Sequence, residues 1–282
     1  MKNDGLSECT IRNYDKYLAH IARHADLGKP EQVKQFIANK ESSNSYKHNL
    51  CLAYDKYCNY YQIQWYKPFY KRVAKTIRIP TEEQLQSLIA STGKIMSVKL
   101  TISKETGLRP VELCNLKTRD VDLERKTIYP TTAKYGAPRI LKISNSLTAM
   151  LTKHINENNL NPNDKLFKGD SDYYGQHYRL VRNKLAKKLN KLSLQTIKLY
   201  DFRHYFATML YAKTKDILYV KQQLGHRKIE TTLIYTQLLS LNDDEWTCKA
   251  TTNTKQATEL IENGFEYVTT TPDELMLFRK RK

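Results

Sequence analysis

The stretch LYDFRHYFATML, residues 199–210, predicts an amphipathic helix with a buried apolar face. Two polar residues, Arg203 and His204, stand near the start of this helix. A guanidinium group in apolar surroundings is costly unless an anion pairs with it. We therefore expect Arg203 to meet an anion, which makes this helix the first candidate for part of a functional site.

The composition of the chain favours a polyanionic partner. Lysine and arginine total 47 against 29 aspartate and glutamate, a formal net charge of +18. This balance indicates nucleic acid, with an affinity that falls as salt rises. An anionic membrane surface is less favoured, since no single basic helix dominates. The amino terminus is polar and the sequence lacks a run of about 18 apolar residues, so we expect a cytoplasmic protein without a membrane span.

A length of 282 residues predicts two domains. Periodic apolar residues predict that residues 6–70 are wholly helical, so the first domain spans residues 1–70. The basic segment 71–80 lacks an apolar face and is interpreted as a linker. The remainder, residues 81–282, is the second domain.

The second domain is predicted to be mainly α-helical with one small β-hairpin. Its first helix begins at a capping box formed by Thr81 and Gln84. Short strands are expected at 126–130 and 139–144, with Lys134 at the tip of the hairpin. Helices are expected at residues 146–158, 173–190, 200–213, 216–223, 229–239 and 254–262, followed by short strands in the tail.

Five polar residues stand at junctions of these expected elements. Arg109 follows a helix break, Lys134 lies at the hairpin tip, and Arg203 lies near the start of its helix. His226 follows a glycine turn, and Tyr235 comes nine residues later. Taken singly, each is an ordinary solvated or packing side chain. Taken together, they supply the groups that cleavage of a phosphodiester requires.

Each requirement of that cleavage is met by a suitable side chain. Two arginines, such as Arg109 and Arg203, can stabilise the charge of the pentavalent phosphate through bidentate hydrogen bonds, without a metal. The phenol of Tyr235 is a feasible nucleophile where positive groups favour its anion. A lysine on a loop, such as Lys134, can deliver a proton to the departing 5′ oxygen, and His226 can add one more donor to the phosphate.

The motifs TGLRPVEL, YDFRHYFAT and LGHRKIETTLIYT, in this order and with the hairpin lysine, resemble the tyrosine recombinase (phage-integrase) family. Among its members the chain looks most similar to archaeal Xer-like recombinases and integrases of mobile elements. The resemblance implies a helical, SAM-like core-binding domain followed by an α-rich catalytic domain. It also implies a site-specific recombinase that cuts duplex DNA through a 3′-phosphotyrosyl bond, without cofactor or metal. The implied assembly is a homo-tetramer on synapsed DNA, associated with the nucleoid.

The resemblance assigns roles to further residues. Glu112 matches an acidic position that orients the first arginine, Arg109. Tyr200 stands where the family usually has histidine, and we include it among the catalytic candidates, although a phenol does not exchange protons near neutral pH as imidazole does. His204 is one residue beyond Arg203, a rotation of about 100° along the helix, so we expect it to pack.

Two other functions remain open at this point. One is a DNA-binding protein whose active site has decayed, and the other is a type IB-like topoisomerase, which shares the chemistry. A metal site is a further alternative, because His20, His24, His48 and Cys51 have spacings that suit zinc. We expect instead that these residues lie on helix surfaces, and that the five cysteines are reduced thiols.

Overall fold

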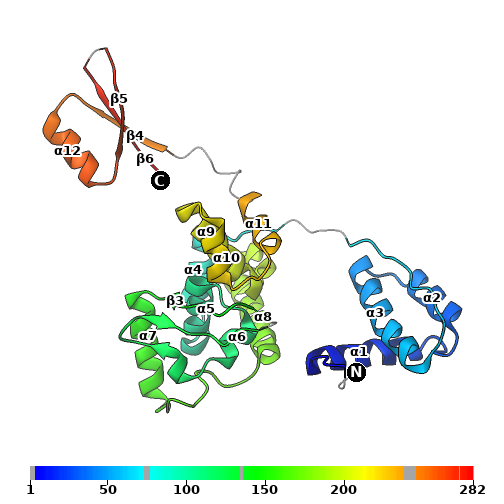
Figure 1. Ribbon diagram of the computed structural model, residues 1–282. Coiled ribbons are helices and arrows are strands. Elements are labelled where there is room, and N and C mark those ends of the chain that lie inside the picture. The colour runs from blue at the N-terminus through cyan, green and yellow to red at the C-terminus, as the bar shows by residue number, and fades with distance from the viewer. Residues whose placement is uncertain (1–3, 73–76, 134–135, 238–245, 273, 282) are drawn as a thin grey trace. The chain divides into compact units, whose positions relative to one another are not determined.

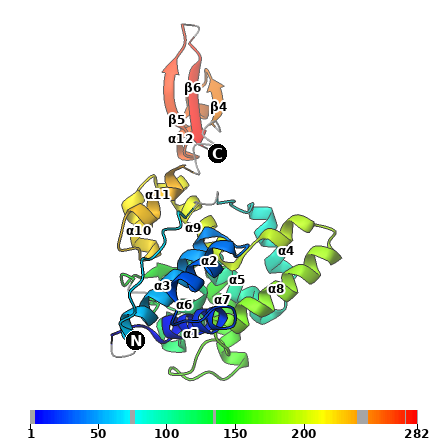
Figure 2. The same cartoon turned by 90° about the vertical axis from the view of Figure 1, so that its right-hand side faces the viewer.

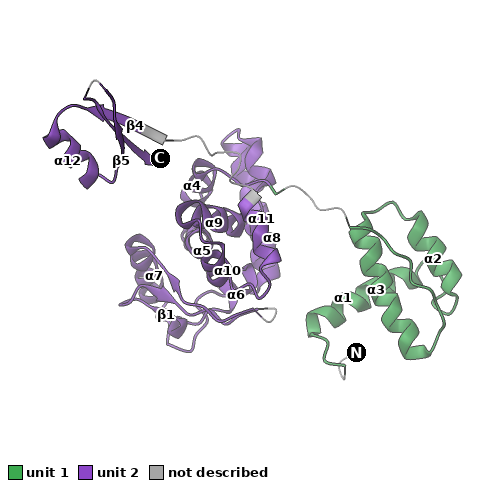
Figure 3. Cartoon of the chain, turned by 45° about the horizontal axis from the view of Figure 1, so that its top comes forward, with its two compact units in different colours: residues 1–77 green, residues 78–282 purple. Residues whose placement is uncertain are grey.

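The computed structural model describes residues 4–72, 77–133, 136–237, 246–272 and 274–281. The chain forms two compact units, Met1–Ile77 and Arg78–Lys282 (Figure 3). In the parts of both units that the structure describes, helices predominate and the strands are short, so the prediction of a mainly α fold is confirmed. No helix in these described ranges is long and apolar enough to cross a membrane.

The described part of the N-terminal unit contains three helices packed around one core. The side chains of Ser7 and Ser43 cap α1 and α3 by accepting backbone hydrogen bonds, and Pro30 occupies the first turn of α2. The fully buried side chains Ile37 and Leu50 belong to the core that these helices share. The helices are α1 (Glu8–Ala22), α2 (Pro30–Asn39) and α3 (Asn44–Tyr61) (Figure 1).

The segment after α3 corrects the prediction of a wholly helical first domain. Gln62 adopts a left-handed backbone conformation, with φ 54°, which ends the helix. The chain then continues without helix, and Ile63, Trp65 and Tyr70 pack against the core of the three helices. The Trp65 indole also donates a hydrogen bond to Asp55 at 3.0 Å. Apolar burial, and not helical hydrogen bonding, therefore holds this segment in place.

The second unit is organised around one central helix, α5 (Lys94–Thr106), which packs against the helices α4 (Glu82–Ala90), α7 (Asn145–Glu157) and α9 (Leu199–Thr214) (Figures 1 and 2). The first of these, α4, begins at the predicted capping box of Thr81 and Gln84. The short helix α6 (Pro110–Asn115) begins with Pro110 in its first turn. The neighbouring helices are α4 (Glu82–Ala90), α6 (Pro110–Asn115), α7 (Asn145–Glu157) and α8 (Ser171–Lys188). All of them contribute to one apolar core.

The predicted hairpin forms part of a small antiparallel sheet. Its strands are β2 (Thr127–Ile128) and β3 (Leu141–Lys142), with Ile128 opposite Leu141. A further strand, β1 (Val121–Asp122), pairs with β2 and was not predicted, because two residues are too few to show alternation. Short 3₁₀ turns, η1 (Thr118–Asp120) and η2 (Leu192–Thr196), connect the neighbouring elements.

Three successive helices, together with the turns between them, carry one part of the candidate site, that of Arg203, His226 and Tyr235. They are α9 (Leu199–Thr214), α10 (Ile217–Leu224) and α11 (Glu230–Gln237), and α9 packs on α5, α10 and α11. Their shared apolar cluster includes Ala207, Val220 and Leu224, together with Tyr235. The long helix α9 therefore lies between α5, which is distant in the sequence, and the two helices that follow it.

The described C-terminal residues form a small sheet with one helix. The elements are β4 (Trp246–Thr251), α12 (Thr254–Glu262), β5 (Glu266–Thr270) and β6 (Met276–Arg281). The central strand, β6, pairs antiparallel with both β4 and β5 (Figure 2). The helix and the last two strands match the prediction, whereas β4 was missed.

Gly107→Ala is expected to lower the free energy of unfolding by at least about 2 kcal/mol. Gly107 ends α5 with a φ of 61°, and an added Cβ would overlap Cδ1 of Phe206 on α9. Chemical denaturation monitored by circular dichroism measures the change. Gly93→Ala, at the other end of α5, is the matched control, because its φ is −66° and its Cβ meets nothing within 4 Å among the described residues. A loss above about 1 kcal/mol is not expected there, and equal losses would contradict the packing argument.

Candidate active site

Arg203 lies inside the second unit, only 1% exposed, and is held by two helix ends. Its Nη1 donates to the carbonyl oxygen of Gly107 at 2.6 Å, and its Nη2 donates to that of Leu224 at 2.7 Å. These carbonyls end α5 and α10, where the backbone carries partial negative charge. The described residues place no carboxylate on Arg203, so the two helix ends stabilise the guanidinium without neutralising it.

A second cluster centres on the carboxylate of Glu112, which is fully buried. It accepts hydrogen bonds from Arg109 Nη1 at 2.8 Å and from Arg139 Nη2 at 2.7 Å. The backbone N–H groups of Arg109 and Ala133 also donate to it, at 3.0 and 3.2 Å. Burial alone would raise the pKa of Glu112, but the two guanidinium groups lower it to about 2. Glu112 is therefore ionised and holds two arginines at once.

The arginines leave the site positively charged. Glu112 pairs with two guanidinium groups, Arg109 and Arg139, and a third, Arg203, is held by backbone carbonyls. One negative charge therefore stands against three positive charges, and two of these are unbalanced. The same field acts on His226, whose pKa is lowered to about 4 by burial and then by Arg203, Arg109 and Arg139. Such a cluster binds an anion, because an anion both pairs with the guanidinium groups and relieves their repulsion.

The hydrogen bonds of His226 define its tautomer. Its Nε2 lies 3.0 Å from Arg203 Nη2, and its Nδ1 lies 2.9 Å from the hydroxyl of Thr232 on α11. A guanidinium group only donates, so Nε2 accepts and the proton of the neutral ring resides on Nδ1. His226 therefore connects the arginine of α9 to the helix that carries Tyr235.

The turn before His226 requires glycine. Gly225 has a φ of 64°, and an added Cβ would lie 2.7 Å from Arg139 Nη1 and 2.9 Å from the carbonyl oxygen of Ala137. The N–H of Ala137 donates to the Gly225 carbonyl at 3.2 Å. The hairpin side of the site and the histidine turn are thus in direct backbone contact.

Tyr235, on α11, is 2% exposed, and its hydroxyl lies 3.1 Å from Nδ1 of His204. Burial raises the pKa of Tyr235 to about 12, although the charges of Arg203 and Arg109 act in the opposite direction. The hydrogen bond shows that the prediction of simple packing for His204 was wrong. The relevant neighbour is Tyr200 and not Arg203, because residues four apart lie on the same face of a helix.

The other predicted site residues are placed less centrally or not at all. Tyr200 lies in the first turn of α9 and is 44% exposed, with the edge of its ring against His204 at a centroid distance of 5.5 Å. Within the described ranges its hydroxyl has no hydrogen-bond partner. Lys134 lies outside the described residues. Its described neighbours Ala133 and Gly136 both approach the site, the first at Glu112 and the second at the Gly225 carbonyl.

Arg139 and Thr232 are site residues that the sequence analysis missed. Arg139 begins the second hairpin strand in the prediction (139–144) but precedes β3 in the structure, and its side chain is fully buried although a basic residue there normally faces solvent. Thr232 is one of two adjacent threonines in α11 and carries no distinguishing pattern. Only the pairing of Arg139 with Glu112, which lies 27 residues earlier in the chain, could have indicated its role.

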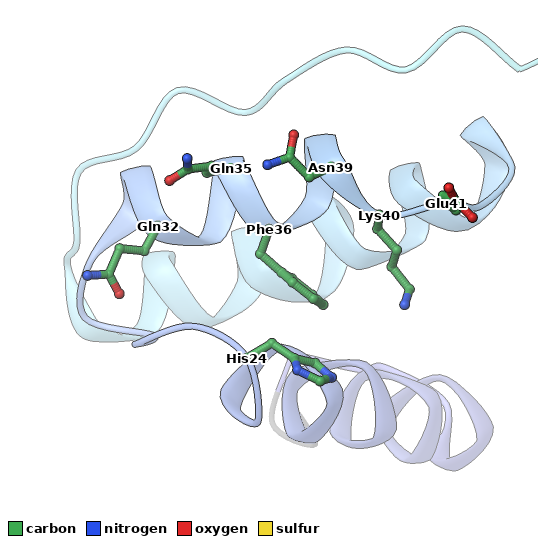
Figure 4. A pocket seen from close by; sticks show the side chains of 7 residues that line it. All are labelled: His24, Gln32, Gln35, Phe36, Asn39, Lys40 and Glu41. Carbon is green, nitrogen blue, oxygen red and sulfur yellow. The ribbon is translucent and has the colours of Figure 1, made fainter.

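One of the histidines considered for zinc, His24, lines a surface pocket of the N-terminal unit (Figure 4). His24 stacks on Phe36 at a centroid distance of 5.0 Å, and its ring meets His20 edge-on. The described residues contain no group of three or more histidine, cysteine or acidic side chains that could hold a metal ion. The remaining pocket lining is Gln32, Gln35, Asn39, Lys40 and Glu41.

The sequence corresponds to a known family. The sequence model of the phage integrase family matches residues 79–241, more than half of the chain. A tyrosine recombinase of Agathobacter rectalis is 30% identical over 249 residues, covering 82% of this chain and 79% of that protein. The chain therefore belongs to the phage integrase family.

The expected similarity to archaeal Xer-like recombinases is also confirmed. The tyrosine recombinase XerA of Pyrococcus horikoshii is 25% identical over 252 residues, covering 83% of this chain and 85% of that protein. A crystal structure of XerA recombinase covers 95% of this chain and 96% of its own, with a TM-score of 0.51 and 21% identity. The Tn1549 transposon integrase, solved with transposon right end DNA, covers 92% of this chain and 94% of its own, with a TM-score of 0.65 and 15% identity. These two structures share the fold.

Glu112→Gln is expected to lower the free energy of unfolding at neutral pH by about 3 kcal/mol, since it leaves the buried guanidinium of Arg139 and the partly buried one of Arg109 without their anion. The carboxylate has a pKa of about 2 in the folded protein against 4.5 ordinarily. Its contribution is therefore present above pH 4.5 and is lost as the pH falls toward 2. Denaturation of both proteins across this range measures the difference, which narrows with falling pH.

Glu124→Gln is the control for the loss of one negative charge, because Glu124 is exposed. Its expected effect stays within about 0.5 kcal/mol. A Glu112→Gln protein as stable as the wild type at neutral pH would contradict the shared-anion arrangement.

Proposed function

We propose that the protein is a site-specific DNA recombinase that cuts and rejoins duplex DNA through a 3′-phosphotyrosyl intermediate. One observation carries this proposal: the Tyr235 hydroxyl lies in the field of Arg203 and Arg109, in a cluster with two unbalanced positive charges. A scissile phosphate supplies the anion that the cluster lacks. Membership in the phage integrase family supports the same activity.

The proposed step balances without an external cofactor. The Oη of Tyr235 bonds to phosphorus as its proton leaves, and the bond from phosphorus to the 5′ oxygen breaks. Lys134 gives the departing oxygen a proton, as the family resemblance implies. Arg109 and Arg203 hold the phosphate, while Glu112 and Arg139 fix the direction of Arg109. Rejoining reverses the step, because the phosphotyrosyl bond retains the energy of the cleaved bond.

His226 has a role that depends on the phosphate. In the structure its Nε2 accepts from Arg203 and has no proton to donate. We propose that an arriving phosphate takes the Arg203 hydrogen bond and offsets the arginine charges that lower the His226 pKa. Protonated Nε2 then donates to the phosphate. The site thereby gains a donor only when DNA is present.

The proposed partner is duplex DNA, bound by both units. The net charge of +18 favours binding to phosphates. A related structure, the XerH site-specific recombinase, was solved bound to its difH substrate. Four protomers on two synapsed sites form the proposed assembly, in which strands are exchanged in two rounds.

Tyr235→Phe is expected to abolish covalent attachment to DNA and to leave DNA affinity within about twofold, because only the nucleophilic oxygen is removed. A nicked suicide substrate traps the adduct for denaturing electrophoresis, and a mobility-shift titration measures affinity. Adduct formation by this variant would contradict the assignment of the nucleophile. Relaxation of a supercoiled plasmid that lacks the recombination site would instead indicate a topoisomerase.

Lys134→Ala is expected to slow cleavage about 10²-fold or more, the usual contribution of a general acid. A substrate with sulfur in place of the bridging 5′ oxygen has a leaving group that needs no proton, so it restores the rate of this variant. Lys142→Ala, on the exposed side of β3, is the control and cleaves both substrates at the wild-type rate. A defect of equal size on both substrates would overturn the role of Lys134.

A further inference from the structure

We propose that His204 is the general base that removes the proton from Tyr235. The inference rests on the proposed function and concerns a residue one position beyond Arg203, the second arginine of the motifs. Nδ1 of His204 lies 3.1 Å from the Tyr235 hydroxyl, within the distance at which a base abstracts a proton. The two rings, on α9 and α11, are 5.8 Å apart between centroids.

The other groups of the site are unsuited to this task. Both ring nitrogens of His226 are occupied in the structure, by Arg203 and by Thr232, and in the proposed DNA-bound state its protonated ring donates to the phosphate and cannot accept a proton. The carboxylate of Glu112 already accepts from two guanidinium groups and two backbone N–H groups. Among the described residues, His204 is the hydrogen-bond partner of the Tyr235 hydroxyl.

Tyr200 does not compete with His204 as a base. It is a phenol like the group it would deprotonate, so it offers no driving force for proton transfer. Its ring packs edge-on against His204 and partly covers it. Tyr200 therefore supports the position of the imidazole and leaves the proton transfer to it.

The surroundings of His204 suit a base that works from its neutral form. Burial lowers its pKa, Asp201 opposes this effect, and Arg203 adds to it. The ring is therefore neutral near pH 7. The proposed base is the tautomer that carries its proton on Nε2 and accepts from the phenol at Nδ1. From α11 the phenol of Tyr235 faces it, and on α9 the ring of Tyr200 packs against it, while the charges of Asp201 and Arg203 act on it through space. Asp201, one turn earlier on α9, stabilises the imidazolium that forms.

The proton and electron balance is complete. As Oη of Tyr235 bonds to phosphorus, its O–H bond breaks and the proton passes to Nδ1 of His204. The bond to the 5′ oxygen breaks, and that oxygen receives a different proton from the general acid. The imidazolium returns its proton to the phenol when the strand is rejoined.

His204→Asn separates a base from a positioning residue. Asparagine places an amide oxygen near the site of Nδ1, so it still accepts a hydrogen bond from Tyr235 but cannot take up the proton. We expect cleavage of the nicked suicide substrate to slow by about 10²- to 10³-fold, with DNA affinity and thermal unfolding unchanged. His177→Asn, on the exposed face of α8, is the matched control and cleaves at the wild-type rate.

Two chemical substitutions show whether the variant is impaired in activating the nucleophile or in protonating the leaving group. The bridging 5′-sulfur substrate does not rescue His204→Asn, because the defect concerns the nucleophile and not the leaving group. Difluorotyrosine at position 235, whose phenol is more acidic, depends less on a base. It is expected to narrow the rate gap between the His204→Asn protein and the protein that retains His204 by about tenfold or more. A gap unchanged by difluorotyrosine overturns the proposal.

The remaining outcomes are also decisive. If the His204→Asn protein cleaves within about threefold of the wild-type rate, His204 only positions Tyr235, and the proposal is overturned. If it cleaves faster than the wild type, the hydrogen bond from His204 holds Tyr235 back from the phosphate, and the proposal is overturned as well. If the wild type itself forms no adduct on the suicide substrate, the proposed function fails. Wild-type adducts with an unimpaired variant refute the base alone, so the two failures are distinguishable.

Discussion

The buried guanidinium of Arg203 is the constraint on which the second unit depends. Its two short hydrogen bonds join the end of α5 to the end of α10 through a side chain of α9. Both helix ends use glycine in a left-handed conformation, Gly107 and Gly225, which exposes the carbonyl groups in the right place. Because carbonyl dipoles stabilise the cation without cancelling it, the interior of the unit retains a positive charge ready for an anion.

The shared carboxylate of Glu112 extends this arrangement to the hairpin. By binding Arg139 and the N–H of Ala133, it ties the residues that flank the hairpin tip to the first arginine of the motif. One ionised carboxylate among three arginines keeps Arg109 oriented and still leaves excess positive charge. That excess has two consequences. It keeps His226 neutral, and through Arg203 it partly offsets the rise that burial causes in the pKa of Tyr235.

Features with local causes could be predicted from the sequence. Thr81 with Gln84 marks a helix start, Gly107 and Gly225 mark helix ends, and the spacing of His226 and Tyr235 identifies the motif. Features created by tertiary contact could not. The burial of Arg139 depends on a partner 27 residues away, and the non-helical segment beyond Gln62 depends on the core that it covers. Local patterns describe neither of these contacts.

The face of α9 on which His204 lies is set by its spacing from Tyr200 and not by its spacing from Arg203. A rotation of about 100° separates His204 from Arg203, but four residues turn the helix through about 400°, which is close to a full turn. His204 therefore shares its helix face with Tyr200, and this face meets α11 and Tyr235. A histidine at either position of that face can approach the nucleophile. The phenol at position 200 thus does not deprive the site of an imidazole, because the face of α9 that contacts the nucleophile carries one a turn later.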